Sequence, residues 1–251
     1  MKQANLLYTG KAKSVYLTDV KGKLIVEFRD DITAFDGGKK DVLKNKGSYN
    51  AEVSRFFFES LEKNGIKTHF VKMLDSRRMV VRQLEMIPLE VIVRNLAAGS
   101  IVRNLPFKEG TKLDPPVIVI DYKDDTRHDP MLNDDLIVAL KIATPQELKK
   151  MKKTALEINK RMTVILAKQG ITLVDFKIEF GRQGKTIFLG DEISMDSMRL
   201  WDKKTGESLD KDVYRFDKGD VMKTYDSVAQ RITHTSGKKY SSKKPVKGIN
   251  R

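Results

Sequence analysis

The segment from Ile171 to Phe180 alternates between apolar and ionisable side chains, and this pattern constrains the fold more than any other feature of the chain. A period of two predicts a β-strand with one face against the core. The opposite face carries Asp175, Lys177 and Glu179. Three ionisable groups in a row are costly to bury unless they meet a metal ion, a substrate or one another. The segment therefore predicts either a functional site or a structural ion-pair ladder.

A second strand is expected to follow a turn at residues 181–184 and to end at Asp191. Carboxylates on neighbouring strands suit a magnesium nucleotide, because Mg2+ prefers oxygen ligands and keeps several waters. We therefore predict that Glu179 and Asp191 form the magnesium pair. A tight turn at these residues, however, sets Asp191 opposite residues 174–176 and nearer to Asp175, so the pair requires a bulge or a bridging water.

The remaining patterns predict a mixture of strands and helices. Residues Thr144 to Glu147 form a capping box with proline at the first helical position, and they predict a helix that ends at Gly170. Apolar residues at helical spacing predict another helix over Asn50–Asn64. Strands are expected at Leu6–Leu17, Leu24–Arg29, Thr68–Leu74, Met79–Leu84 and Leu89–Val93. Because these elements do not alternate regularly as βαβ units, we predict an α+β fold.

A glycine turn near the start of the chain is a candidate phosphate site. Gly10 precedes Lys11, Ala12 and Lys13, and the two lysines are expected to share one face of a strand. They can then deliver two ammonium groups to one polyphosphate. An ordinary strand that carries lysines is the alternative. Neither the P-loop nor the Rossmann glycine pattern occurs in the chain.

A second candidate anion site lies further along the chain. Arg94 can grip a phosphate or carboxylate, small residues follow it, and Ser100 can cap a following helix. A simple strand-to-helix turn explains the same residues equally well. Asp129 precedes a proline, which is expected to hold it extended and so to aim its carboxylate. Arg199 and Arg215 add positive charge for an anionic substrate.

Composition narrows the classes of function. The net charge is +14, but residues 233–251 contain six basic residues and no acidic one, which predicts a disordered basic tail. The remaining charge of +8 suits a cleft for anionic substrates. The absence of cysteine excludes disulfides and thiolate catalysis. No apolar stretch is long enough to span a bilayer, and the start has no signal core, so a cytoplasmic protein without membrane contacts is expected.

Several motifs occur together in a fixed order. They are Gly10–Lys13, Val93–Ser100, His128–Pro130, Leu173–Gly181, Gly190–Glu192 and Ser197–Asp202. In this order they strongly resemble the SAICAR synthetase family, over about Leu6 to Ile232. The strand at Asp175 and the segment Arg199-Leu200-Trp201-Asp202 are the most specific parts of the resemblance.

The resemblance implies an ATP-grasp-like fold of two lobes and commonly a homodimer. A small antiparallel β-lobe is expected over residues 1–84, a larger catalytic lobe over 85–232, and the basic tail over 233–251. The implied reaction joins L-aspartate to the carboxylate of a carboxylated aminoimidazole ribotide. ATP first converts this carboxylate to an acyl phosphate, with Mg2+ as cofactor, and the aspartate amine then displaces phosphate.

The resemblance also implies roles for individual residues. ATP contacts are implied for Lys11, Ala12, Lys13, Met86, Lys123, Glu179 and Asp191, and Glu179 and Asp191 are also the implied magnesium ligands. Ribotide contacts are implied for Arg94, Ser100, Asp129, Lys177, Arg199 and Arg215. Lys177 and Asp175 are the implied catalytic residues. Asp36, Gly37 and Lys40 resemble a mobile loop of the family that closes over aspartate.

Two other classes of function fit parts of the sequence. A nucleic-acid-binding protein fits the basic charge, but aromatic residues do not interleave with the basic clusters and no RNP, KH or helix-turn-helix pattern is present. We therefore expect no nucleic-acid partner. A small-molecule kinase shares the nucleotide residues, but it needs no amine substrate.

Overall fold

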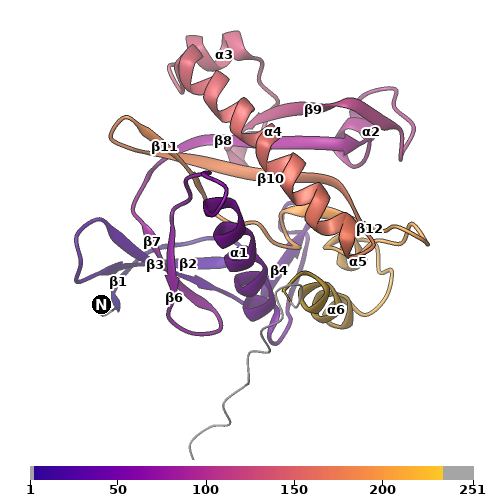
Figure 1. Cartoon of the computed structure of the whole chain (residues 1–251), viewed down its shortest axis with the longest axis horizontal. Helices are drawn as coiled ribbons and strands as arrows, with labels where there is room; N and C mark the ends of the chain where they lie inside the picture. Colours follow the sequence, from indigo (N-terminus) through magenta and orange to yellow (C-terminus); the bar gives the residue numbers. More distant parts are fainter. Residues whose placement is uncertain (1–2, 234–251) are drawn as a thin grey trace, which may run out of the picture.

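The computed structural model describes residues 3–233, which form three antiparallel sheets and their covering helices (Figure 1). Of the basic tail expected at residues 233–251, only the first residue lies within the described part. The α+β class is confirmed. No helix of the described residues is long and apolar enough to cross a membrane.

The first sheet has the strand order β1-β2-β3-β7-β6. Its strands are β1 (Gln3–Thr9), β2 (Lys13–Thr18), β3 (Lys23–Phe28), β6 (Phe70–Met73) and β7 (Arg78–Arg82). The single run expected over Leu6–Leu17 is therefore wrong, because the chain turns at Gly10, whose backbone N donates to Lys13 O at 2.8 Å. As a result Lys11 lies in the turn and Lys13 begins β2, so the two lysines do not share one face of a strand.

The second sheet has β10 at its centre. Along one side β10 (Ile171–Gln183) pairs with β8 (Glu85–Leu96), which pairs in turn with β9 (Lys112–Tyr122). Along its other side β10 pairs with β12 (Met198–Asp202) near its start and with β11 (Thr186–Gly190) near its end. The alternating segment is thus held by backbone hydrogen bonds on both sides.

The β10–β11 hairpin differs from the expected one. Gln183 pairs with Thr186, so the loop contains only Gly184 and Lys185, and Glu179 lies opposite Gly190. The expected turn at residues 181–184 is wrong, and so is the expected shift of Asp191 toward Asp175. Asp191 directly follows the partner of Glu179, and no bulge is needed to bring the two carboxylates together.

Helices cover these sheets. Pro145–Lys168 forms α4, whose predicted capping box is confirmed: Thr144 N donates to Glu147 Oε2 at 2.8 Å, and Glu147 N donates to Thr144 Oγ1 at 3.2 Å. The helix expected at Asn50–Asn64 is α1 (Lys46–Glu62), which begins and ends earlier. The other elements are β4 (Asp31–Ala34), η1 (Phe35–Gly37), β5 (Lys39–Val42), α2 (Ser100–Asn104), η2 (Asp125–Arg127), α3 (Asp134–Ala139), α5 (Asp212–Arg215) and α6 (Val221–Thr233).

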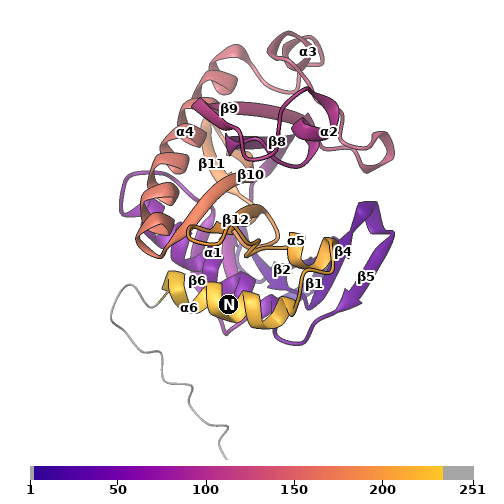
Figure 2. The same ribbon diagram turned by 90° about the vertical axis from the view of Figure 1, so that its right-hand side faces the viewer.

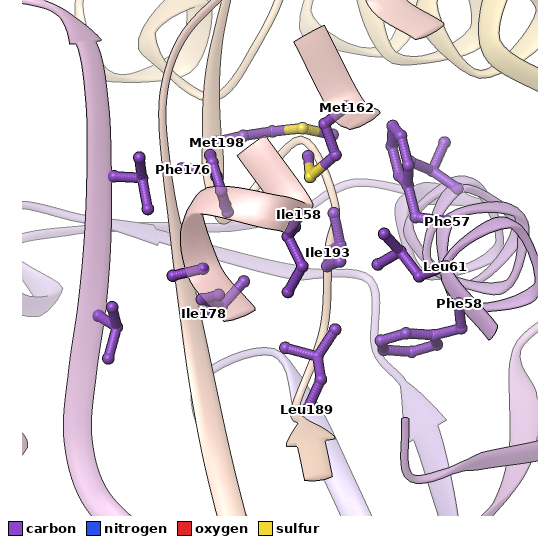
Figure 3. Packing of buried hydrophobic residues seen from close by; sticks show 14 of the residues in the cluster. Phe57, Phe58, Leu61, Ile158, Met162, Phe176, Ile178, Leu189, Ile193 and Met198 are labelled. Atoms are coloured by element: carbon purple, nitrogen blue, oxygen red, sulfur yellow. The ribbon is translucent and has the colours of Figure 1, made fainter. Parts of the chain in front are cut away.

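The largest hydrophobic cluster joins the two five-stranded sheets. In Figure 3, Phe57 and Phe58 from α1 face Ile158 and Met162 from α4, with Ile178 of β10 beside them. The same cluster includes Val26 and Val81 of the first sheet. Although the first sheet ends before residue 85 and the second begins there, one core connects them, and the division into lobes at residue 84 stays a prediction.

Candidate functional site

The ionisable face of β10 is extended by charged residues of β8. Asp175 lies opposite Arg94, and Glu179 lies opposite Glu90, so these side chains share one face of the sheet. Lys177 Nζ donates to Glu90 Oε1 at 2.5 Å, and Arg94 Nη1 donates to Asp175 Oδ2 at 2.7 Å. The ion-pair ladder is thus present, and its members continue into two clusters at the two ends of the row.

The cluster at the Glu179 end combines carboxylates and lysines from four elements. Lys123, after β9, donates to Glu179 Oε1 at 2.5 Å. Lys13, from β2, donates to Asp191 Oδ1 and lies 3.4 Å from Glu192 Oε1. The early glycine turn and the late hairpin therefore converge on one place, as a nucleotide site there requires.

The pKa values of the two carboxylates of the predicted magnesium pair shift in opposite directions. Burial raises the pKa of Glu179 to about 7, and the nearby charge of Asp191 adds to the shift. Burial also acts to raise the pKa of Asp191, but Lys13 and Lys123 outweigh it and lower this pKa to about 2. The pKa of Glu179 stays raised although two lysines lie nearby, so the positive charge around this pair is incomplete. Both carboxylates can offer oxygen ligands to a further cation, and the residues present therefore fit Mg2+.

The protein residues alone do not make a complete cation cage. Within residues 3–233 there is no group of three or more histidine, aspartate or glutamate side chains arranged to hold a metal ion. A Mg2+ ion held by Glu179 and Asp191 would thus require other ligands, such as phosphate oxygens and water, as is usual for magnesium nucleotides.

Other predicted ATP residues surround this cluster. Lys11 Nζ pairs with Asp125 Oδ1 of η2 at 2.8 Å, and both side chains are exposed. Lys11 lowers the pKa of Asp125, and so do Lys123 and Lys177. The ion pair of Lys11 and Asp125 therefore lies at the edge of the same cluster. Ala12 directly precedes Lys13, and its carbonyl accepts from the backbone N of Arg29 at 2.8 Å, a contact outside the cluster. Met86 of β8 packs over Gly190, where a Cβ would lie 3.3 Å from the Met86 sulfur.

The cluster at the Asp175 end contains three arginines. Asp175 Oδ2 accepts from Arg94 Nη1 at 2.7 Å and from Arg199 Nη1 at 2.9 Å. Arg199 Nε donates to Asp212 Oδ2 at 2.9 Å, and Arg215 Nη1 donates to Asp212 Oδ1 at 2.5 Å. The side chains of Arg199 and Arg215 remain 20% and 27% exposed, so both can still reach a ligand.

Arg94 and Ser100 differ from their sequence-based interpretation. The Arg94 side chain is only 2% exposed, and its guanidinium donates to Asp175, to Ala98 O and to Ser100 Oγ. Ser100 does not cap α2: the N-cap residue is Gly99, and the Ser100 hydroxyl accepts from Arg94 instead. Arg94 therefore holds Asp175 and the turn before α2, and its guanidinium is not available for bidentate binding of a ligand.

The expected extended conformation of Asp129 is also wrong. Its φ is +47°, and its Oδ1 accepts from Asp124 N at 2.8 Å, so the carboxylate folds back onto its own loop. The loop still lies beside the ionisable face. Burial raises the pKa of Asp121 on β9 to about 6, and the charges of Glu90 and Asp129 add to the shift.

The predicted mobile loop is a β-hairpin fastened to α5. Asp36 and Gly37 lie in the η1 turn between β4 and β5, and Lys40 is exposed on β5. Lys39 Nζ donates to Tyr214 O at 2.8 Å and to Asp217 Oδ1 at 2.6 Å. Figure 2 shows this hairpin beside α5, which carries Arg215. The structure places the hairpin next to the arginine cluster without bringing Lys40 into it.

Sequence reasoning missed several charged residues of the site. Glu90, Glu192 and Asp212 are all buried partners of predicted site residues. The charged run Asp210-Lys211-Asp212, three residues before Arg215, was the available signal for one of them. Glu192 directly follows Asp191 in the motif Gly190–Glu192, which was the available signal for it, whereas Glu90 could be found only from strand register.

Comparison with known proteins agrees with this architecture. A family model described as SAICAR synthetase matches residues 6–232. A protein of Methanoregula boonei named phosphoribosylaminoimidazole-succinocarboxamide synthase is 81% identical over 233 residues, which cover 93% of this chain and 91% of the relative.

Solved structures agree as well. A SAICAR synthetase in complex with ADP superimposes with a TM-score of 0.87 at 49% identity, covering 90% of this chain and 97% of the other. The phosphoribosylaminoimidazole-succinocarboxamide synthase of Ehrlichia chaffeensis gives a TM-score of 0.89 at 40% identity, covering 91% and 98%. With its sheets, its charged central strand and these relatives, the chain belongs to the SAICAR synthetase family.

Proposed function

We propose that the protein joins L-aspartate to the carboxylate of 5-amino-1-(5-phospho-D-ribosyl)imidazole-4-carboxylate, with conversion of ATP to ADP and phosphate. The product is SAICAR, an intermediate of purine biosynthesis. Membership of the family supports a ligase that uses ATP and aspartate. The observation that carries the proposal for this chain is the row of charges on β10, with a lysine–carboxylate cluster at one end and an arginine cluster at the other.

The reaction proceeds in two steps. The γ-phosphoryl group of ATP passes to a carboxylate oxygen of the ribotide, which gives an acyl phosphate and ADP. The aspartate nitrogen then attacks the acyl carbon, loses a proton, and displaces phosphate as the C–O bond breaks. Activation is required because a free carboxylate is a poor electrophile at neutral pH.

The lysine–carboxylate cluster is proposed to hold the nucleotide. Lys13 and Lys123 lie on either side of the Glu179–Asp191 pair and can bind phosphate oxygens as well as neutralise the two acids. Lys11 is proposed to cover the phosphates from the edge. Glu179 and Asp191 would hold Mg2+, which neutralises phosphate charge when it is bound.

Lys177 lies between the two clusters and is proposed to act on the transferred group. Its side chain is 39% exposed while its ammonium is held by Glu90, so the charge is both positioned and accessible. A positioned ammonium stabilises negative charge that develops during phosphoryl transfer. Asp175 is proposed to orient the arginines of the ribotide site, because it bonds Arg94 and Arg199 with the same oxygen.

The ribotide is proposed to lie at the arginine cluster. Arg199 and Arg215 are the partly exposed members and can bind its phosphate, while Arg94, Ser100 and Asp129 hold the surrounding turns. A homodimer and a cytoplasmic location stay predictions from the sequence resemblance.

ADP release with each substrate omitted in turn tests the proposal. A ligase of this kind releases ADP at its full rate only when ATP, the ribotide and aspartate are all present. Release that does not depend on aspartate would indicate a kinase and would refute the proposed reaction. Lys177→Met should lower kcat by more than tenfold and leave the dissociation constant of ADP nearly unchanged, which separates chemistry from nucleotide binding.

A further inference from the structure

Lys211 is a half-buried lysine whose ammonium has no hydrogen bond or ion pair with any residue from 3 to 233. It is the N-cap residue of α5, and its backbone N donates to Met195 O at 3.3 Å. The backbone contact fixes the start of the side chain against the segment between β11 and β12. An ammonium without a partner is costly at such a position.

The two acidic groups that act on the charge of Lys211, Asp196 and Glu192, pair closely with other residues. Asp196 accepts from Lys46 Nζ at 2.5 Å and from the Tyr225 hydroxyl at 2.7 Å. Glu192 accepts from Ser194 Oγ at 3.0 Å and lies 3.4 Å from Lys13 Nζ. Both acids act on Lys211 through space, but neither makes a hydrogen bond or a close ion pair with it within residues 3–233.

The electrostatic surroundings show the same shortage of negative charge. Burial lowers the pKa of Lys211; Asp196 acts against this shift, and Arg215 and Lys46 add to it. A lysine whose pKa is lowered in the folded state makes the fold less stable at neutral pH, where the charged form is enforced. The folded protein thus pays free energy to keep this charge.

The position of Lys211 connects the two clusters of the candidate site. Glu192, which influences its pKa, contacts Lys13 of the lysine–carboxylate cluster. Arg215, which also influences the pKa of Lys211, belongs to the arginine cluster and lies four residues after Lys211, at the end of α5. The Lys211 ammonium and the Arg215 guanidinium therefore lie within electrostatic range of each other, as two cations that share one anion must.

We propose that Lys211 binds an oxyanion of a substrate beside Arg215, either a carboxylate of aspartate or the phosphate of the ribotide. The proposal rests on the proposed function, because it takes the substrates from there. A bound oxyanion supplies the missing partner. The Lys211 charge therefore destabilises the substrate-free protein and stabilises the substrate complex. Charge-assisted hydrogen bonds of this kind account for affinity differences of about ten- to a hundredfold.

The test is Lys211→Met, which keeps the length of the side chain and removes its charge. The apparent KM for aspartate or that for the ribotide should rise about ten- to a hundredfold, and the substrate affected identifies the oxyanion. The dissociation constant of ADP should change less than threefold. Lys203→Met, the same change at an exposed lysine, is the control and should alter neither KM.

Thermal unfolding distinguishes binding from a structural role. Because Lys211→Met removes an uncompensated charge, the substrate-free variant should unfold at the same or a higher temperature than the parent protein. Unchanged KM values for both substrates, or a lower unfolding temperature with equal increases in both KM values, would overturn the proposal. If the parent protein itself releases ADP without aspartate, the proposed function fails instead, and this result is separate from any effect of the substitution.

Discussion

Replacement of Gly99 by alanine would place a methyl group against the guanidinium of Arg199. A Cβ at Gly99 would lie 2.6 Å from Arg199 Nη2 and 2.7 Å from both Arg199 Cζ and Nη1. A flexible side chain could normally move aside. Here the guanidinium is held at 2.9 Å by Asp175 on one side and at 2.9 Å by Asp212 on the other, so displacement breaks at least one charge-assisted contact.

The magnitude follows from two separate costs. Gly99 has a φ of +63° and a ψ of −128°, a backbone conformation that essentially only glycine adopts, so alanine there costs about 1–3 kcal/mol in backbone strain. Loss of one hydrogen bond to a charged group adds about 1.5–3 kcal/mol. We therefore expect Gly99→Ala to lower the free energy of unfolding by about 3–6 kcal/mol and to raise the KM for the ribotide, because Arg199 is displaced.

Gly206→Ala is the control for alanine at a positive φ without a steric clash. Gly206 has a φ of +75°, and a Cβ there would meet no atom within 4 Å, so only the cost of about 1–2 kcal/mol applies. Urea unfolding of both variants, together with ribotide KM values, gives the comparison. Equal destabilisation by the two substitutions, with an unchanged KM in Gly99→Ala, would refute the claim that the carboxylates hold Arg199 in place.

Three further predictions concern other charged groups. Burial raises the pKa of Glu179 to about 7, above its unfolded value, so the stability that this group contributes is lost as the pH rises from about 5 to 8. In urea titrations of the nucleotide-free protein, Glu179→Gln should reduce this decrease in the free energy of unfolding with pH. An unchanged decrease would contradict the raised pKa. The pKa of Asp210 is also raised to about 7, but Asp210 makes the same contribution to the pH dependence in the parent protein and in Glu179→Gln, so it cancels when the two are compared. Lys46→Met leaves Asp196 buried without its close cation and should cost about 3–5 kcal/mol in the same assay. A loss below about 1 kcal/mol would show that the Tyr225 hydroxyl and the nearby charge of Lys211 suffice for this carboxylate. Lys40→Ala should raise the KM for aspartate far more than that for ATP in steady-state kinetics, and equal increases would remove Lys40 from the aspartate pocket.

Local patterns predicted those elements whose causes are local. The capping box at Thr144 involves residues three apart, and the alternation along β10 requires only that one face be buried. Both features can be read without knowing what packs against them. The charged row was found for the same reason, although the sequence could not decide between a ladder and a site, and the structure contains a ladder that leads into the candidate site.

The glycines were harder to interpret, because glycine serves two physical purposes. Gly181 was interpreted as a turn residue, but it lies within β10, where a Cβ would come within 2.7 Å of Leu84 Cβ and 3.0 Å of Glu85 O. Gly181 lets the neighbouring chain at Leu84 and Glu85 approach β10 closely. The turn glycine is Gly184, which has a φ of +57°. Only the neighbouring strand β8 distinguishes the two, and this error produced the wrong register for Asp191.

The roles of Arg94 and Ser100 could not be predicted for a related reason. An arginine beside small residues suggests an anion site, yet burial against Asp175 decides whether it meets a ligand or a protein carboxylate. That contact joins residues 81 positions apart. The sequence shows which groups carry charge, and the fold decides which charges are already neutralised.

Because β10 is bordered by β8 along one side and by β11 and β12 along the other, its backbone has little freedom to shift, and ion pairs hold the charged side chains of its row. The dipoles and charges of the row are oriented before any substrate arrives, so little reorganisation energy is needed while a phosphoryl group is transferred. Adaptation to different ligands falls instead to the elements around the strand, namely the glycine turn, the β4–β5 hairpin and α5. Changes in substrate preference can therefore arise at these surrounding elements while the central strand stays the same.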